Sequence, residues 1–331
     1  MRSEILMDLT LDFEKPVLEL ENQIKELKAL SNRPGIDISQ ELKTLQKKVD
    51  SLIDEIYTNL SPWEKVQLAR HPSRPHTVDF IEHMIKDFHE IHGDRKFADD
   101  MAMITGFGYL DEHKVAIIGI EKGEKTNDRI KRNFGMPRPE GYRKALRVMK
   151  LASQFSIPIV TFVDTPGAFP GIGAEERGQS QAIAENLVEM FELEVPTISV
   201  VIGEGGSGGA LGIAITDRTL MMEHSIYSVI SPESCASILW SDPKMAETAA
   251  NSLKLGAQQA LELGVIDKII DEPAGGAHRN KKKGIENVKK ALSEELRKLK
   301  SINSKKIKKD RFEKYRQIGN KTLVENKSKT T

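Results

Sequence analysis

The sequence predicts an α/β fold, because strand-like apolar segments alternate with segments of helical length between about residues 95 and 272. Strands separated by helices need crossover connections, and such connections favour parallel pairing within one sheet. With 331 residues, of which 39% are hydrophobic and 30% charged, the chain is long enough for one large core with extensions. An amphipathic N-terminal segment and a lysine-rich C-terminal segment flank this core.

Two amphipathic helices are expected before the core. In the first, which follows Pro16, apolar residues recur at helical spacing: Val17, Leu20, Ile24 and Leu27. A second series of the same kind runs from Leu42 to Ile56, and the sequence SNRPG at 31–35 separates the two. We expect an antiparallel helical hairpin whose narrow apolar seams pack against each other or against a partner.

The expected core begins with a pair of strands, 101–110 and 114–123, that turns at Asp111 and Glu112. The alternating segments that follow are a helix at 141–156, a strand at 157–164, a helix at 175–194, a strand at 195–202 and a glycine-rich turn into ALGIAIT at 210–216. Further helices are expected at 231–240 and 255–264.

The C-terminal segment carries a large excess of positive charge. From Arg279 to Thr331 there are 19 Lys and Arg against 6 Asp and Glu, although the whole chain has a formal net charge of zero. Residues 281–300 are compatible with a helix, whereas we expect the last ~25 residues to be disordered because few of them are apolar. We therefore divide the chain into an N-terminal helical region (1–94), a core (95–280) and a basic tail (281–331).

Several classes of protein are disfavoured by composition. No apolar run approaches the ~20 residues of a membrane-spanning helix, and the N-terminus lacks a signal pattern, so we expect a cytoplasmic protein. The single cysteine, Cys235, excludes an internal disulfide and a cysteine-rich zinc site, and we assign it no role. The basic tail lacks aromatic stacking patterns and groove-reading motifs, so nucleic-acid binding is not expected as the main function.

The segment GEGGSGGA, Gly203–Ala210, contains five glycines in seven positions and must let backbone approach something closely. Three chemistries fit it. One is a dinucleotide fingerprint, with Glu223 as the downstream acid. Another is a GxSxG nucleophile elbow in which Ser207 works with Asp217 and with His224 or His278. The third is an oxyanion hole, in which backbone N–H groups at a helix start stabilise developing negative charge.

Six long motifs in fixed order then carry a resemblance. They are RHPSRP (71–76), HGDRKFADD (92–100), RNFGMPRPEGYRKALRVMKLA (132–152), VDTPGAFPGIGAEERGQSQAIAENL (163–187), VVIGEGGSGGALGIAI (200–215) and YSVISPESCASILW (227–240). Over about residues 12–280 the sequence resembles the alpha subunits of the bacterial multi-subunit acetyl-CoA carboxylase carboxyltransferase, whereas the tail lies outside the resemblance. The resemblance implies a crotonase-like (ClpP/crotonase) ββα superhelix, here with an N-terminal helical hairpin and a basic C-terminal tail.

The resemblance also implies a function. This chain would be one half of an enzyme that moves a carboxyl group from carboxybiotin to acetyl-CoA, giving malonyl-CoA, the first committed step of fatty acid biosynthesis. Biotin would arrive on the biotin carboxyl carrier protein after loading by a biotin carboxylase, so no covalent cofactor and no metal are expected in this chain. A beta subunit in an alpha2beta2 heterotetramer would carry a zinc ribbon and most of the CoA site.

By the same resemblance, the backbone N–H groups of Gly208 and Gly209 form the oxyanion hole for the ureido oxygen of biotin. Gly205 and Gly206 would shape the approach. Gly167 and Ala168, in the loop at the end of the preceding strand, are the second choice for a wall of the biotin pocket. Two alternatives remain open: a self-sufficient crotonase-type acyl-CoA hydratase or isomerase, and a hydrolase that depends on Ser207.

Two charged groups could add to this site. Glu175 and Glu176 are acid/base candidates, although charges in the first turn of a helix are the simpler interpretation. A basic cluster could meet CoA phosphates or an acidic partner surface, or could be a solvated helix face. Its members are Lys131, Arg132, Arg138, Arg143, Lys144 and Arg147.

Overall fold

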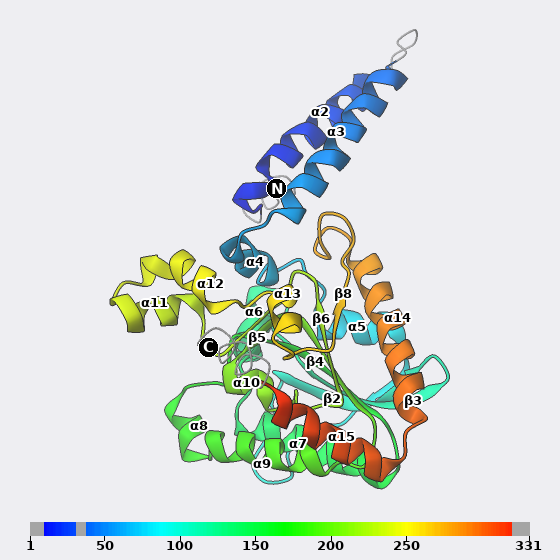
Figure 1. Cartoon of the computed structure of the whole chain (residues 1–331), viewed down its shortest axis with the longest axis vertical. Coiled ribbons are helices and arrows are strands. Elements are labelled where there is room, and N and C mark those ends of the chain that lie inside the picture. Colours follow the sequence, from blue (N-terminus) through cyan, green and yellow to red (C-terminus); the bar gives the residue numbers. More distant parts are fainter. Residues whose placement is uncertain (1–9, 31–37, 320–331) are drawn as a thin grey trace, which may run out of the picture.

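The computed structural model describes residues 10–30 and 38–319, and it shows a mixed β-sheet covered by helices on both faces. A helical hairpin projects from one end of this core (Figure 1). None of the helices in the described ranges is both long and apolar enough to cross a membrane.

The sheet is antiparallel at one edge and parallel over the rest. Its strands are β1 (Ile85–Glu90), β2 (Met103–Leu110), β3 (His113–Ile120), β4 (Ile159–Thr165), β5 (Thr197–Gly206), β6 (Arg218–Met222), β7 (Ile226–Ser228) and β8 (Lys268–Ile270). They are ordered β1-β2-β3-β4-β5-β6-β8, and β7 pairs with the end of β5. Pairing is antiparallel from β1 to β3 and parallel beyond.

The helices come before, between and after the strands. The N-terminal region has η1 (Asp12–Glu14), α2 (Lys15–Leu30), α3 (Ser39–Thr58), α4 (Pro62–Ala69) and α5 (Thr77–Met84). The middle of the chain has α6 (Thr126–Lys131), η2 (Asn133–Gly135), α7 (Pro139–Gln154), α8 (Ile172–Glu176), α9 (Gln179–Glu192) and α10 (Ser207–Leu211). The C-terminal part has α11 (Pro232–Trp240), η3 (Pro243–Met245), α12 (Ala246–Leu253), α13 (Ala257–Glu262), α14 (Lys281–Lys300) and α15 (Ser304–Gln317).

Two apolar clusters sandwich the sheet. On one face α7 and α9 contribute buried residues such as Met149 and Met190, which share a cluster with Val201 of β5. On the other face Phe80 of α5 and Leu292 of α14 share a second cluster with strand residues. Strands buried on both faces are continuous apolar runs, which explains why β4 and β5 are fully buried along their length.

The expected N-terminal hairpin is confirmed, and its seams pack against each other. Val17 and Ile24 of α2 lie in one cluster with Val49 and Ile53 of α3. Leu68 of α4 belongs to the same cluster, so the base of the hairpin is tied to the helix that leads into the core.

Three details of the core differ from expectation. The helix expected at 175–194 is two helices, because Gly178 adopts a left-handed conformation between α8 and α9. Strand β5 continues to Gly206, so half of the glycine segment is strand rather than turn. β1 joins the sheet before residue 95, where the core was expected to begin, although the division into domains itself stays a prediction.

The expected disorder of the last ~25 residues is wrong for part of that segment. α15 is a helix held by Arg311, whose side chain is only 1% exposed. The guanidinium pairs with Asp217 at 2.9 Å and donates to the carbonyls of Met190, Leu193 and Val195. Since a buried charge requires partners, the tail is part of the core to residue 319; residues 320–331 lie outside the described ranges.

This arrangement predicts a large effect of Arg311→Met. The change leaves the Asp217 carboxylate buried without its cation, and we expect the free energy of unfolding to fall by about 3–5 kcal/mol. Urea denaturation of both proteins measures this difference, with Lys309→Met, an exposed position on the same helix, as the control. Equal midpoints for Arg311→Met and the control would contradict the docking of α15.

Candidate active site at the glycine loop

The candidate site lies where the parallel strands β4 and β5 end beside each other. Thr165, the last residue of β4, is in register with Gly205 near the end of β5, and α10 starts at the next residue after the strand. Ligands of open α/β sheets bind outside the carboxyl ends of parallel strands. The glycine loop is therefore at the edge of the sheet where a site is expected.

The backbone of the glycine loop touches the backbone of the loop after β4. A Cβ atom added to Gly209 would lie 2.4 Å from the carbonyl carbon of Gly167 and 2.5 Å from the nitrogen of Ala168. A Cβ atom on Gly206 would lie 2.2 Å from the carbonyl oxygen of Pro166. No side-chain atom fits at these distances, so both positions require glycine for close packing of two stretches of backbone.

Gly208 has a different environment. A Cβ atom added there would meet nothing within 4 Å, and the same holds for Gly167 on the opposing loop. Of the two glycines expected to form the hole, Gly209 therefore faces protein and Gly208 faces open space. Gly205 packs beneath the ring of Tyr227, which would lie 2.7 Å from an added Cβ.

The peptide groups of α10 are anchored through their carbonyl oxygens. The carbonyl of Gly208 accepts from the N–H of Gly212 at 3.0 Å, and that of Gly209 accepts from the hydroxyl of Tyr142 at 3.1 Å. In the part of the chain that the structure describes, nothing accepts a hydrogen bond from the N–H groups of Gly208 and Gly209. Such donors at the start of a helix are available to an external oxygen that carries negative charge.

Buried ion pairs hold the strand ends beneath this loop. Asp164 accepts from the backbone N–H of Glu204 at 2.9 Å and pairs with the ammonium group of Lys122 at 2.6 Å. Glu204 in turn pairs at 2.7 Å with Arg70, the residue that follows α4, and Arg70 also pairs with Glu233 of α11 at 2.6 Å. These contacts join the ends of β3, β4 and β5 to two helices, which fixes the geometry of the glycine loop.

The electrostatic consequences follow from this pairing. Burial works to lower the pKa of Arg70, but the neighbouring carboxylates, first among them Glu204, outweigh it and raise that pKa above its usual range. Burial works to raise the pKa of Glu233, but hydrogen bonds from Arg70 lower it. Arg70 therefore remains a cation and Glu233 an anion, so both charges of this ion pair are present at neutral pH.

The structure supports the nucleophile-elbow interpretation in the backbone conformation of Ser207 but not in the positions of the acid and the base. Ser207 is exposed and has a φ of +50°, a left-handed conformation that is strained for serine. Asp217, however, pairs with Arg311, and His278 pairs with Glu14 at 2.9 Å. His224 makes no hydrogen bond to Ser207 within the described ranges, so no base is in place.

The other charged candidates do not converge on the loop. Glu175 and Glu176 are exposed on α8. Most of the basic cluster instead contacts residues 92–101. Lys144 forms an ion pair with Asp99, and Arg143 forms one with Asp94. Arg147 donates to the carbonyls of His92 and Gly93, and Arg132 donates to the carbonyl of Met101. Arg138 lies over the ring of Phe169, 4.9 Å from its centroid, and Lys131 is exposed.

Sequence reasoning missed a cavity beside the loop. It has a volume of about 240 Å³ and is mostly apolar, and Ser207, Leu211, Tyr227, Val229 and Leu263 are among the residues that line it. These residues come from α10, from β7 and the residue that follows it, and from the end of α13, and no sequence motif links them. The ion pair between Arg70 and Glu204 was missed for the same reason, since 134 residues separate its partners.

One group of metal-type ligands occurs among the described residues, Glu14, His71 and His278. The Nδ1 atom of His71 accepts from the N–H of Ser73 at 3.1 Å, so in neutral histidine the proton lies on the other ring nitrogen. Burial works to raise the pKa of Glu14, but hydrogen bonds from His278 and Tyr57 outweigh it and lower the pKa to about 2. This proton arrangement favours a hydrogen-bonded ion cluster over metal coordination.

Solved structures that resemble this chain share the expected fold. Transcarboxylase 12S, determined with methylmalonyl-coenzyme A and methylmalonic acid bound, superposes with a TM-score of 0.57 at 19% identity, over 69% of this chain and 42% of that one. A Pseudomonas malonate decarboxylase hetero-tetramer in complex with coenzyme A superposes with a TM-score of 0.55 at 14% identity, over 70% of this chain and 93% of that one. The crotonase-like α/β fold is thereby confirmed.

Sequence comparison identifies the family. The profile of the acetyl co-enzyme A carboxylase carboxyltransferase-like family matches residues 10–319, and the chain belongs to this family. Relatives named acetyl-coenzyme A carboxylase carboxyl transferase subunit alpha are 50% identical over 93% of this chain in Azoarcus, 50% over 94% in Thermus thermophilus and 52% over 93% in Burkholderia lata. The matches cover 96%, 98% and 96% of those proteins. The match also includes α14 and α15, which we had placed outside the resemblance.

The two central glycines are predicted to respond differently to substitution. Gly209→Ala pushes a methyl group into the backbone of Gly167 and Ala168, and we expect a loss of about 1–3 kcal/mol in the free energy of unfolding. Gly208→Ala projects into open space and should leave stability within about 1 kcal/mol of the parent. Chemical denaturation of the two variants measures the difference. Equal destabilisation by both would show that Gly208 also packs against protein.

Proposed function

We propose that this chain is the alpha half of an acetyl-CoA carboxylase carboxyltransferase, which moves a carboxyl group from carboxybiotin to acetyl-CoA to give malonyl-CoA. The names of relatives at 50–52% identity support this function rather than a self-sufficient hydratase or a hydrolase dependent on Ser207. The observation in the fold that carries the proposal is the open side of Gly208 at the start of α10, where its N–H has no acceptor among the residues that the structure describes.

In this proposal the N–H groups of Gly208 and Gly209 bind the ureido oxygen of biotin. When the carboxyl group leaves nitrogen, the bonding electrons move into the ureido system and the oxygen gains negative charge. Fixed N–H donors at a helix start stabilise that charge without reorganising, and the loss of one such donor typically costs ~100-fold or more in rate. The carboxyl group leaves as CO2, and the biotin enolate takes a proton from the methyl group of acetyl-CoA. The carbanion formed there attacks CO2 to give malonyl-CoA, so no side-chain base is needed.

The loops around the hole have supporting roles in the same proposal. Gly206 and Gly209 hold the glycine loop against the loop after β4, and Gly205 lets it pass under Tyr227. Gly167 and Ala168 then form a wall beside the open face of Gly208. The apolar cavity beside Ser207 and Leu211 gives the carrier's biotin ring a surface to pack against.

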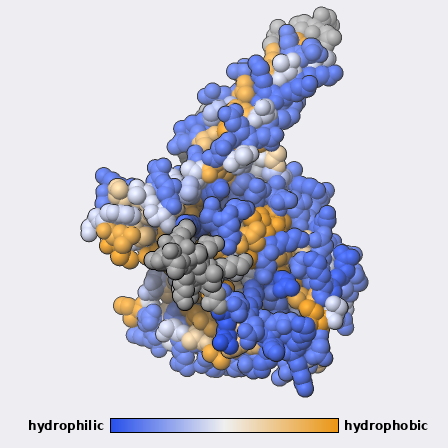
Figure 2. Space-filling model, viewed as in Figure 1, coloured by the Kyte–Doolittle hydropathy of each residue, from blue (hydrophilic) through white to orange (hydrophobic). Residues whose placement is uncertain are grey.

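The proposed enzyme works only as an assembly. A beta subunit would supply most of the CoA site and a zinc ribbon in an alpha2beta2 heterotetramer, and the biotin carboxyl carrier protein, loaded by a biotin carboxylase, would deliver biotin in the cytoplasm. An exposed apolar surface supports a partner near the site: Ile238, Leu239 and Trp240 of α11 are 72%, 63% and 42% exposed. Figure 2 shows hydrophobic surface on this protruding segment, and Arg70 ties α11 to the glycine strand.

Reconstitution tests the function. The purified chain alone should not turn over acyl-CoA, whereas addition of a carboxyltransferase beta subunit should yield a complex that decarboxylates malonyl-CoA in the presence of biotin, the reverse reaction. In that complex Gly208→Val should lower the rate by ~100-fold or more while CoA affinity stays close to that of the parent, because the thioester would occupy the hole of the other subunit.

The matched control is Ser207→Ala, which keeps its backbone N–H and should retain most of the rate. Robust hydratase or esterase activity of the isolated chain would refute the divided site. A loss of CoA affinity in Gly208→Val that parallels the loss of rate would show that the hole serves the thioester instead of biotin.

A further inference from the structure

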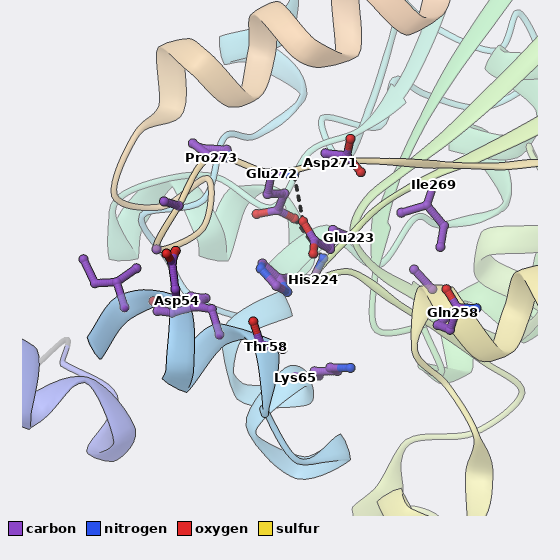
Figure 3. A pocket seen from close by; sticks show the side chains of 15 residues that line it. Asp54, Thr58, Lys65, Glu223, His224, Gln258, Ile269, Asp271, Glu272 and Pro273 are labelled. Carbon is purple, nitrogen blue, oxygen red and sulfur yellow. Dashed lines mark hydrogen bonds between the residues drawn. The ribbon is translucent and has the colours of Figure 1, made fainter. Parts of the chain in front are cut away.

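A second cavity, of about 430 Å³, lies at the carboxyl ends of β6 and β8, away from the glycine loop. The hairpin helix α3 and the start of α4 cover it, so that its walls come from both the N-terminal region and the core (Figure 3). The function proposed above does not use this cavity.

His224, which is 5% exposed, is one of the buried residues that line this cavity. Its Nδ1 atom is enclosed by protein and has no hydrogen-bond partner among the described residues, so Nε2 is the ring nitrogen that a ligand could reach. The carboxylate of the adjacent Glu272 already has protein partners, since it pairs with Arg74 at 2.6 Å and accepts hydrogen bonds from the backbone N–H groups of Ala277 and His224. Burial lowers the pKa of His224 despite nearby carboxylates, so at neutral pH the ring is uncharged and offers one acceptor nitrogen.

The rim of the cavity is acidic. Asp54 of α3, Glu223 after β6 and Asp271 after β8 are exposed, and none of the three forms an ion pair within the described part of the chain. Lys65 is the one lysine or arginine among the lining residues, and Figure 3 places it across the cavity from Asp271. Because Glu272 is neutralised by Arg74, the rim retains an excess of two negative charges.

These carboxylates are too far apart to share one metal ion. The described residues bring three metal-type ligand atoms together only at Glu14, His71 and His278, none of which lines this cavity. Between the carboxylates lie apolar side chains, among them Ile53 and Ile269. Separated negative charges with apolar surface between them suit a ligand whose positive charges are spaced along a hydrocarbon chain.

We propose that this cavity binds a linear aliphatic polyamine. One ammonium group donates to Nε2 of His224 and a second pairs with Asp54. The third lies between Glu223 and Asp271, which follow the neighbouring strands β6 and β8, and the methylene segments lie on Ile53 and Ile269. Since Asp54 belongs to the hairpin and the other two carboxylates to the core, the ligand bridges the two parts. A ligand that binds only the docked arrangement stabilises it by mass action.

Calorimetric titration of the full chain with spermidine, at neutral pH and physiological ionic strength, tests the proposal. We expect one saturable site per chain. Asp54→Asn/Asp271→Asn removes two exposed carboxylates with little change of shape, and should weaken binding about tenfold. His224→Phe keeps a ring beside Tyr57 but removes both nitrogens, and should weaken binding as well.

The matched control is Glu41→Gln/Glu247→Gln, which removes the same charge at exposed positions outside the cavity and should bind spermidine like the parent. Equal weakening by the control would reveal nonspecific attraction to a polycation and overturn the site. Propylamine binding as tightly as spermidine would contradict the spaced charges. If magnesium chloride at an equal concentration displaced spermidine stoichiometrically, the cavity would be a metal-ion site and not a polyamine site.

Discussion

The active-site geometry depends on one close contact, in which the backbone at Gly206 and Gly209 lies directly against the backbone of residues 166–168. Two loops from neighbouring parallel strands can approach so closely only where no Cβ atom intervenes. At the start of α10, which follows this contact, the N–H groups of Gly208 and Gly209 have no hydrogen-bond acceptor among the described residues. Gly206 and Gly209 are packed against backbone, whereas Gly208 between them faces open space and is available to a ligand.

Charge pairing beneath the loops keeps that contact in register. Lys122, Asp164, Glu204 and Arg70 form a chain of contacts across three strands and into α4. Removing one member of a buried ion pair leaves an uncompensated charge, so the arrangement tolerates little change. Because α4 follows directly from the hairpin and shares Leu68 with its apolar cluster, the N-terminal region is mechanically connected to the glycine loop.

The sequence predicted elements whose pattern is local. Alternating segments located β2 to β5 and the helix α7 between them, and spacing of three and four located α2 and α3, since these patterns depend on side chains a few positions apart. α15 was not predicted because the residue that holds it against the core is Arg311. In the sequence a charged residue of this kind looks like a solvent-exposed one, and its five hydrogen-bond acceptors come together only in the fold. β1 was not predicted because it is short and mostly exposed, with Asp87 in a left-handed conformation.

The candidate site was predicted in outline because its signals are also local in the sequence. A run of glycines indicates close approach of backbone, and long ordered motifs indicated the family. The sequence could not distinguish Gly208 from Gly209, because the same residue type serves packing at one position and access at the other. Nor could it show that the arginines and lysines of 132–147 turn inward, since their acceptors are mostly backbone carbonyls and aspartates of the 92–101 loop.

The central claim is that the hole at Gly208 and Gly209 serves biotin, and a structure of the assembled enzyme with biotin bound tests it most directly. The account predicts that the ureido oxygen lies about 2.7–3.1 Å from the nitrogens of Gly208 and Gly209. The CoA thioester would then lie against the partner subunit. A thioester oxygen at Gly208, with biotin bound elsewhere, would contradict the account.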